Sequence, residues 1–134
     1  MEEQDRKSVV LTYLNACGRG DFEEDINCFA ENATFWVPGR MPFSGTLHGR
    51  TEIYEKNLLP SAKLSVPGSV SIEIGSVVAE GSKVAAEWVF SRTTLSGKAY
   101  RNVFFGLFEV INSKIDSMRE YLDTQYAKDM LWSE

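Results

Sequence analysis

The chain is 134 residues long, with 43% hydrophobic residues, 25% charged residues and a formal net charge of −5. This composition excludes a disordered chain, and the length predicts one domain over residues 1–134. The acidic balance, without any run of Lys or Arg longer than a pair, argues against nucleic acid as a partner. No apolar run approaches the ~18 residues of a membrane span, so we expect no membrane contact and a cytoplasmic location.

The first sixty residues have the pattern of helices with one strand inserted. The first helix has an apolar stripe at helical spacing, formed by Val10, Tyr13, Leu14 and Cys17. Gly18 and Gly20 are expected to end this helix. Asp21 and Glu24 have the spacing of a capping box and predict a short second helix. Its apolar side would comprise Phe22, Ile26 and Phe29, with Asn32 as its terminator.

A strand and a third helix follow. Residues 33–37 are mainly β-branched or aromatic and stop at Pro38-Gly39, which predicts a strand that ends in a turn. Thr51 is expected to cap a helix that Pro60 ends.

The rest of the chain alternates as strands joined by tight turns. Strands are predicted at residues 70–74, 84–94, 100–111 and 114–123, and a short helical tail contains Met130, Leu131 and Trp132. This order predicts an α+β fold, in which the helices lie on one side of a curved sheet and the last four strands form an antiparallel meander.

Several stretches support a more specific interpretation. They are Val9-Val10 to Tyr13-Leu14, Gly20-Asp21-Phe22, Cys28 to Thr34, Gly45 to Arg50, Ser113-Lys114-Ile115 and Arg119 to Asp123. With the order of elements, they resemble the nuclear-transport-factor-2-like (NTF2-like) superfamily, also called cystatin-like. Within it, the chain is similar to SnoaL-like polyketide cyclases and ketosteroid isomerases, over nearly its whole length.

The resemblance implies a cone-like curved antiparallel sheet with the N-terminal helices packed on its concave side. Such a cone holds an apolar pocket suited to a small hydrophobic molecule. The superfamily includes isomerases, cyclases, hydrolases, dehydratases and binding or assembly modules, so the resemblance specifies the fold more than the reaction.

Glu120 is the main catalytic candidate. By the resemblance it stands where SnoaL-like cyclases and limonene-epoxide hydrolases have their catalytic carboxylate. Facing inward beside Met118 and Leu122, and near Phe104 and Phe108, it would be desolvated, and its raised pKa would suit a general base. The alternative is that Glu120 lies on the outer face and pairs with Lys or Arg.

Two further residues are catalytic candidates. Tyr13 matches the tyrosine that donates a hydrogen bond to the substrate oxygen in ketosteroid isomerases, although its ring could equally serve core packing. Asn102 could donate its amide to a ligand oxygen, or bond to a neighbouring side chain.

The chain also departs from the related enzymes. By the resemblance, Val37 replaces the proton-shuttling aspartate of ketosteroid isomerases. Gly106 replaces their second acid and the histidine of the cyclases. Neither residue carries a proton, which argues against a steroid isomerase. The epoxide-hydrolase constellation, an arginine with two acids, would need a charged pair on strand 100–111, where Asn102 lies between Tyr100 and Phe104.

The remaining residues expected to line the pocket are apolar or aromatic: Phe35, Trp36, Val37, Tyr54, Leu58, Tyr100, Phe104, Phe108, Met118 and Leu122. Trp36, beside Pro38-Gly39, is expected at the rim of its mouth, or else as an exposed interface aromatic. Strand 84–94 has two possible orientations. The family register places Glu87 inward, whereas hydrophobicity places Trp88 and Phe90 inward.

Other polar residues are expected to have structural roles. His48, in a Gly-flanked turn, lacks partners for a metal site, and no metal or other cofactor is expected. Cys17 and Cys28 lack CxxC spacing and are expected to be buried. Asp123 and Arg119 share the outer side of their strand, where a salt bridge or a cap on the tail helix is expected.

These features predict cofactor-free acid–base chemistry of isomerase or cyclase type on a small hydrophobic carbonyl or polycyclic compound. The alternatives are a module of the same fold that binds a small molecule without turnover, or an assembly module. Strand 100–111 is apolar on both faces, which, with the habit of the superfamily, predicts a homodimer through the open face of the sheet.

Overall fold

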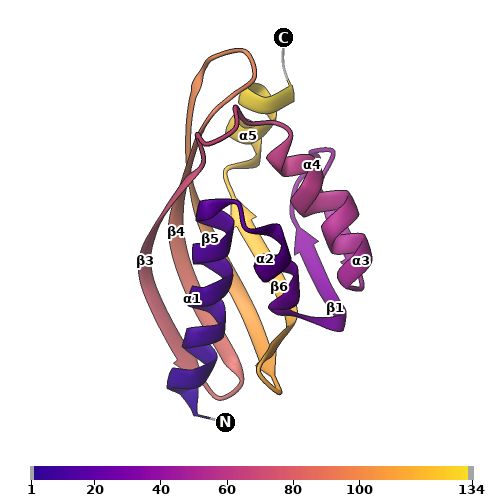
Figure 1. Ribbon diagram of the computed structural model, residues 1–134, viewed down its shortest axis with the longest axis vertical. Helices are drawn as coiled ribbons and strands as arrows, with labels where there is room; N and C mark the ends of the chain where they lie inside the picture. The colour runs from indigo at the N-terminus through magenta and orange to yellow at the C-terminus, as the bar shows by residue number, and fades with distance from the viewer. Residues whose placement is uncertain (1, 133–134) are drawn as a thin grey trace.

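The computed structural model describes residues 2–132. Its helical segments are α1 (Glu3–Arg19), α2 (Phe22–Asn27), α3 (Arg50–Ile53), the π-helical turn η1 (Tyr54–Leu58), α4 (Leu59–Ala62) and α5 (Thr124–Trp132). Its strands are β1 (Phe29–Val37), β2 (Gly45–His48), β3 (Ser71–Glu80), β4 (Lys83–Thr93), β5 (Ala99–Ile111) and β6 (Lys114–Leu122). The predicted α+β fold is confirmed, because a curved sheet holds the N-terminal helices on its concave side (Figure 1).

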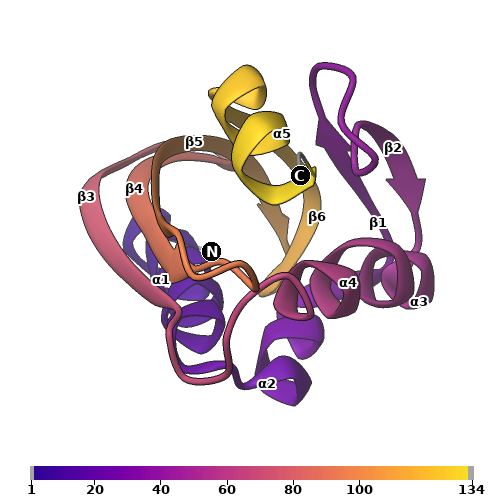
Figure 2. The ribbon, with the colours of Figure 1, turned by 90° about the horizontal axis from the view of Figure 1, so that it is seen from above.

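The strands form one sheet in the order β2-β1-β6-β5-β4-β3. Strands β3 to β6 make the predicted antiparallel meander. The prediction of an antiparallel sheet is wrong at one place, because β1 pairs with β6 in parallel, with Phe35 opposite Met118. This long-range pairing adds β1 and β2 to the curved sheet on the side of β6 opposite to β5, as the view from above shows (Figure 2).

Some element boundaries differ from the prediction. Phe29 begins β1 instead of ending the second helix, because its fully buried ring lies in the core and its backbone is paired with Ile115. Asn32, the expected terminator, lies within the same strand. Strand β2 was not predicted, and His48, expected in a turn, pairs within it with Thr34.

The third helical segment runs past Pro60, which was expected to end it. Pro60 lies in the first turn of α4, directly after the π-helical turn. Proline has no N–H to donate to the turn before it, and in this chain that turn is π-helical instead of α-helical. The helical segment continues past Pro60 to Ala62.

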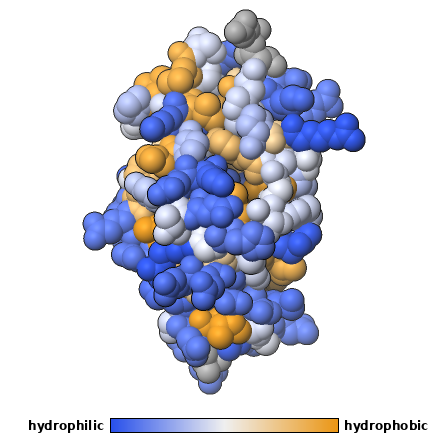
Figure 3. Space-filling model, turned by 90° about the vertical axis from the view of Figure 1, so that its right-hand side faces the viewer, coloured by the Kyte–Doolittle hydropathy of each residue, from blue (hydrophilic) through white to orange (hydrophobic). Residues whose placement is uncertain are grey.

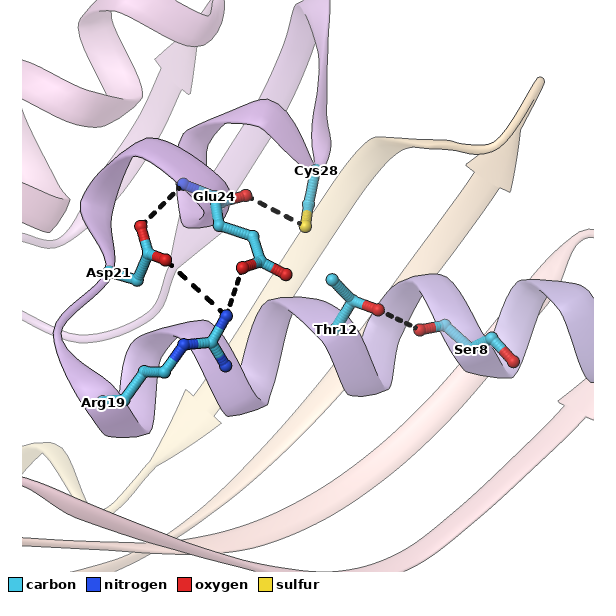
Figure 4. A network of polar contacts seen from close by, with 6 residues as sticks. All are labelled: Ser8, Thr12, Arg19, Asp21, Glu24 and Cys28. Carbon is cyan, nitrogen blue, oxygen red and sulfur yellow. Dashed lines mark hydrogen bonds and ion pairs between the residues drawn. The ribbon is translucent and has the colours of Figure 1, made fainter.

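The junction between α1 and α2 follows the predicted signals in part. Gly20 adopts the left-handed conformation with φ of 72° and closes α1. The Asp21 carboxylate accepts a hydrogen bond from the Glu24 N–H at 3.1 Å, so Asp21 caps α2. The reciprocal half of the capping box is absent at this junction, because the Glu24 side chain pairs with Arg19 instead (Figure 4).

Side chains alternate cleanly across the central strands. On β4 and β5 the buried set comprises Val84, Ala86, Trp88, Arg92, Tyr100, Asn102, Phe104, Phe108 and Val110. Glu87 is exposed, which settles the open orientation of strand 84–94 in favour of hydrophobicity. On the outer face of β5, Val103 is 54% and Phe105 is 43% exposed. Strand β5 is thus apolar on both faces, as its sequence indicated, and its outer face is not covered within one copy of the chain.

The surface is uneven in character. The side that carries β1 and α3 is mainly hydrophilic and has separate apolar patches (Figure 3). Within residues 2–132, no helix is both long enough and apolar enough to span a membrane.

Candidate functional site

A cavity of about 860 Å³ lies between the concave face of the sheet and the helices. Its size falls within the usual range for small-molecule sites. Its wall is mainly apolar and includes Leu14, Val37, Leu58, Ile72, Trp88, Phe90, Phe104, Leu122 and Leu131. Val66 and Leu95 also line it and are 39% and 67% exposed, which places its opening to solvent beside them.

Two carboxyl groups and one guanidinium group that are at least partly buried reach this apolar cavity from three different elements. They are Asp25 of α2, Arg92 of β4 and Glu120 of β6. Two more cations, Arg19 and Lys63, line the cavity but are exposed. The cavity therefore contains one arginine and two acids, a combination that the sequence analysis did not find. The three residues lie on different elements instead of sharing strand 100–111.

Glu120 lies inside, as predicted. It faces Gly106 across the β5–β6 pairing and lines the cavity. Burial raises the pKa of Glu120 to about 8, Arg92 acts to lower it and Asp25 acts to raise it further. No side chain among residues 2–132 forms an ion pair with this carboxyl group within 4.0 Å. The group can therefore exchange a proton near neutral pH.

Gly106, opposite Glu120, has no space for a side chain. A Cβ atom at Gly106 would lie 2.7 Å from the Phe108 ring and 2.9 Å from the Trp88 ring. Aromatic rings therefore fill the place where the related enzymes carry a second polar group. The resulting wall beside Glu120 is apolar, which strengthens the desolvation of its carboxyl group.

Tyr13, Cys17 and Asp25 form a polar cluster between α1 and α2. The Cys17 thiol donates to Asp25 Oδ2 at 3.1 Å, and Asp25 is only 2% exposed. Burial raises the pKa of Asp25 to about 7, whereas the thiol donor lowers it. Asp25 Oδ1 is buried and has no hydrogen-bond partner among the described residues. Asp25 thus lines the cavity with one carboxyl oxygen that accepts no hydrogen bond from the described residues.

The Tyr13 ring packs edge-on against Phe29 with 5.2 Å between ring centroids, and Tyr13 also lines the cavity. Burial raises the pKa of its phenol well above the ordinary value. Tyr13 therefore stays protonated and can act as a hydrogen-bond donor, as well as contributing to the core.

Arg92 is 6% exposed and inward-facing on β4. Its Nη1 donates to the Ser61 carbonyl at 2.9 Å and to Ser65 Oγ at 3.0 Å. The guanidinium lies 4.5 Å from the centroid of the Phe90 ring and 5.1 Å from that of Tyr100. Its Nε is buried without a partner among the described residues.

Sequence reasoning missed both Arg92 and Asp25. The alternation of β4 contains the signal for Arg92, since it shares the parity of Trp88 and Phe90. Asp25 follows Phe22 by three residues and therefore lies on the apolar side of α2.

The predicted lining residues divide into two groups. Those that line the cavity are Tyr13, Val37, Leu58, Tyr100, Phe104, Glu120 and Leu122. Phe35, Phe108 and Met118 do not line it, because they lie fully buried in the packed core. Tyr54 is outside the cavity and borders a separate depression with Phe22 and Ile26.

Asn102 does not line the cavity and takes the second of its two expected roles, a bond to a neighbouring side chain. Its amide donates to the Tyr100 hydroxyl at 3.0 Å and to the Asp123 carbonyl at 3.1 Å. Both of its donors are thereby used within the protein, so Asn102 orients Tyr100 instead of facing a ligand.

Trp36 is not at the rim of the cavity. Its ring lies on the outer side of the sheet, 4.0 Å below the Arg119 guanidinium and edge-on to Tyr121. Asp123 caps α5 by accepting the Tyr126 N–H at 2.9 Å, one of the two predicted roles. Arg119 forms the contact with Trp36 in place of an ion pair with Asp123.

The remaining predicted structural residues have ordinary environments. His48 is exposed on β2, Cys28 is buried and Cys17 is partly buried. Among residues 2–132, no group of three or more His, Cys, Asp or Glu side chains has a geometry that could hold a metal ion.

A curved sheet wrapped around helices, with an apolar cavity between them, defines the NTF2-like and cystatin-like class of folds. The chain belongs to the SnoaL-like domain family, whose sequence profile matches residues 10–118.

Solved structures agree with this assignment. An NTF2-like protein from Burkholderia xenovorans LB400 is 26% identical, with 98% of each chain covered and a TM-score of 0.76. A putative isomerase from Bacillus subtilis is 18% identical, with 100% of this chain and 98% of that chain covered and a TM-score of 0.79. An LEH-like epoxide hydrolase from M. tuberculosis is 20% identical, with 98% and 92% covered and a TM-score of 0.75. A search of curated proteins finds no match.

Proposed function

We propose that this protein catalyses cofactor-free acid–base chemistry of isomerase or cyclase type on a small hydrophobic carbonyl or polycyclic compound. The observation that carries the proposal is the position of Glu120, whose carboxyl group lines an apolar cavity and has a pKa raised to about 8. A carboxyl group of this kind can both take and return a proton near neutral pH.

In the proposed reaction, ionised Glu120 removes a proton from a carbon next to the substrate carbonyl. The electron pair of the broken C–H bond moves toward the carbonyl oxygen and forms an enolate. Tyr13, which stays protonated, donates a hydrogen bond to that oxygen. Where a C=C bond adjoins the carbon that lost the proton, the enolate is a dienolate. Glu120 then returns the proton to its far (γ) carbon, which moves the double bond next to the carbonyl, completes the isomerisation and regenerates the carboxylate.

A second candidate function is hydrolysis of an epoxide. The observation that favours it is the presence of one arginine and two acids at the same cavity, namely Arg92, Asp25 and Glu120. In this reaction Asp25, whose pKa is the lower of the two, would in its ionised form remove a proton from water, which attacks an epoxide carbon. Protonated Glu120 would give its proton to the oxygen of the opening ring. The similarity to the LEH-like epoxide hydrolase supports the fold that this reaction requires.

The experiment that tests the proposal is turnover of a panel of polycyclic ketones and aryl epoxides by the wild-type protein and by Glu120→Gln. Because positioned acid–base groups contribute roughly 10²–10⁴-fold to rates, we expect Glu120→Gln to lose turnover by about that factor. The wild-type rate of the isomerase reaction should rise with pH up to about 8, as Glu120 ionises.

Glu87→Gln is the matched control, because Glu87 lies exposed on β4 and points away from the cavity. It should keep wild-type turnover. Ketones alone as substrates support the isomerase, and epoxides alone support the hydrolase. Binding of panel compounds without turnover contradicts both and leaves a binding module.

A further inference from the structure

Arg92 is a buried cation without an anionic partner in the protein. Among residues 2–132, none of the ion pairs within 4.0 Å includes Arg92. Its short hydrogen bonds go to neutral oxygens, the Ser61 carbonyl and Ser65 Oγ. A buried charge is costly unless an opposite charge and hydrogen bonds compensate it. The protein supplies the hydrogen bonds in part and leaves the charge uncompensated.

Arg92 lines the cavity, and its guanidinium has hydrogen-bond donors that the protein does not use fully. Nη1 is occupied by two acceptors, whereas the contact of Nη2 with Ser61 Oγ is long, at 3.5 Å. Nε has no partner at all among the described residues. Guanidinium groups with free N–H donors bind carboxylates and other oxyanions strongly, through charge-assisted hydrogen bonds.

The acids of the same cavity do not neutralise Arg92. Neither Asp25 nor Glu120 comes within ion-pair distance of it. Burial raises the pKa of Asp25 to about 7 and that of Glu120 to about 8, so both are substantially protonated near neutral pH. The other cations at the cavity, Arg19 and Lys63, are exposed to solvent, and Arg19 already pairs with Glu24.

An aromatic wall leads away from Arg92 into the cavity. Phe90 lies under the guanidinium, the Phe90 and Phe104 ring centroids are 5.7 Å apart, and Phe104 stacks on Trp88 at 5.7 Å. A flat ring system that places an anionic oxygen at Arg92 would therefore extend along these three rings.

We infer that Arg92 is the anion-binding residue of this cavity and that the natural ligand is an aromatic or polycyclic compound with an anionic oxygen group, either a carboxylate or an ionised enol or phenol. This inference deepens the proposed function by naming the class of its substrate. Arg92 anchors the anionic oxygen, while the hydrophobic body of the ligand lies in the cavity that Glu120 lines.

The test compares two probes of nearly equal shape, 2-naphthoate and the neutral 2-naphthamide, by isothermal titration calorimetry at neutral pH. A charge-assisted hydrogen bond in an apolar site favours the anion, so we expect the wild-type protein to bind 2-naphthoate about tenfold more tightly or better. Arg92→Gln should reverse this preference, because the carboxylate would then lose its hydration without gaining a cation. Arg92→Lys, which keeps the charge without the planar group, should show an intermediate preference.

Arg101→Gln is the control, since Arg101 is exposed on β5 and outside the cavity, and it should bind both probes as the wild type does. Equal affinity of the two probes for the wild type, or no binding of 2-naphthoate, overturns the inference without any variant. A preference that survives Arg92→Gln, or one that Arg19→Gln or Lys63→Gln removes, also overturns it. Glu120→Gln should keep the preference for 2-naphthoate even where turnover is lost, so this test is independent of the catalytic proposal.

Discussion

Glu120 combines a position on a well-packed strand with a side chain that the surroundings keep from ionising. Its carboxyl group gains a proton more readily in the folded chain, where its pKa is about 8, than in an unfolded chain, where the ordinary value is 4.5. Asp25 behaves in the same way, because its pKa is about 7 in the folded chain and 3.8 is the ordinary value. Two acids with raised pKa values at one cavity are typical of functional sites, which often sacrifice stability for chemistry.

Because both pKa values are raised in the folded state, the free energy of unfolding should fall as the pH rises. Because the folded state binds the Glu120 proton more tightly, the contribution of Glu120 to stability is complete below about pH 4.5 and is lost as the pH rises toward 8. Since one pKa unit corresponds to about 1.4 kcal/mol, Glu120→Gln should raise the free energy of unfolding near pH 8 by roughly 2–4 kcal/mol, after allowing for the partial access of the group to solvent.

Urea unfolding of the wild type and Glu120→Gln across this pH range measures the effect. The free energies of unfolding of the two proteins should become equal at the acidic end of the range. The free energy of unfolding of the variant should still fall with rising pH, but less steeply, because Asp25 also ionises. Parallel pH profiles for the two proteins would show that the carboxyl group is solvated and would remove the basis of the proposed function.

At the scale of elements, the close contact between β4 and β5 shapes the wall beside Glu120. Trp88 of β4 and Phe108 of β5 both cover Gly106, whose missing side chain makes room for them. The two strands therefore place aromatic rings, and no polar side chain, beside Glu120 at this point.

Gly106→Ala should destabilise the protein by about 1–3 kcal/mol, because its Cβ would overlap two rings that are already packed. Gly18→Ala is the matched control. Its Cβ would be in ordinary contact with Ile72, at 3.5 Å, and it lies within α1, where Ala is favoured over Gly. Chemical denaturation should show a loss for the first variant and no loss for the second. Equal stability of Gly106→Ala and the wild type would mean that the two rings can move apart.

The same elements show what could be predicted from the sequence. On β6, alternation left both orientations of Glu120 open, and the resemblance to SnoaL-like proteins favoured the inward one; the side chain lines the cavity. On β4 the count from a turn conflicted with hydrophobicity, and Arg92 stayed hidden because a charged residue is rarely expected on an inward face. Asp25 stands in an acidic stretch typical of a solvated helix start, although tertiary contacts bury it.

Long-range features of the fold escaped prediction for a related reason. Strand β2 is a short edge strand whose paired residues on β1 lie 8 to 14 positions earlier, and the parallel pairing of β1 with β6 joins segments far apart in the chain. The local pattern of apolar and polar residues does not show which strands pair with one another. The likeness to a known family supplied the overall shape, which local patterns alone did not determine.

At the scale of the whole molecule, the outer face of the sheet carries exposed apolar side chains. Val103 and Phe105 of β5 lie beside Tyr121 of β6, and the Phe105 and Tyr121 ring centroids are 6.2 Å apart. We propose that a second copy of the chain covers this face, in line with the predicted homodimer, because exposed apolar clusters of this kind often mark interfaces.

The paired substitution of Val103 and Phe105 by Lys should convert a dimer into a monomer in sedimentation equilibrium, because it places two charges on the apolar face. Leu95→Lys serves as the control, since Leu95 is exposed on the hairpin between β4 and β5 and away from this face. A wild-type protein that sediments as a monomer at high concentration would contradict the prediction.

The parallel pairing of β1 with β6 has a further consequence. It makes β6 an interior strand, hydrogen-bonded to β1 along one edge and to β5 along the other. Backbone amides in such strands exchange with solvent only when large parts of a protein open together. Glu120 is thus attached to a slowly exchanging part of the chain, and the backbone that carries its carboxyl group is in place before a ligand arrives.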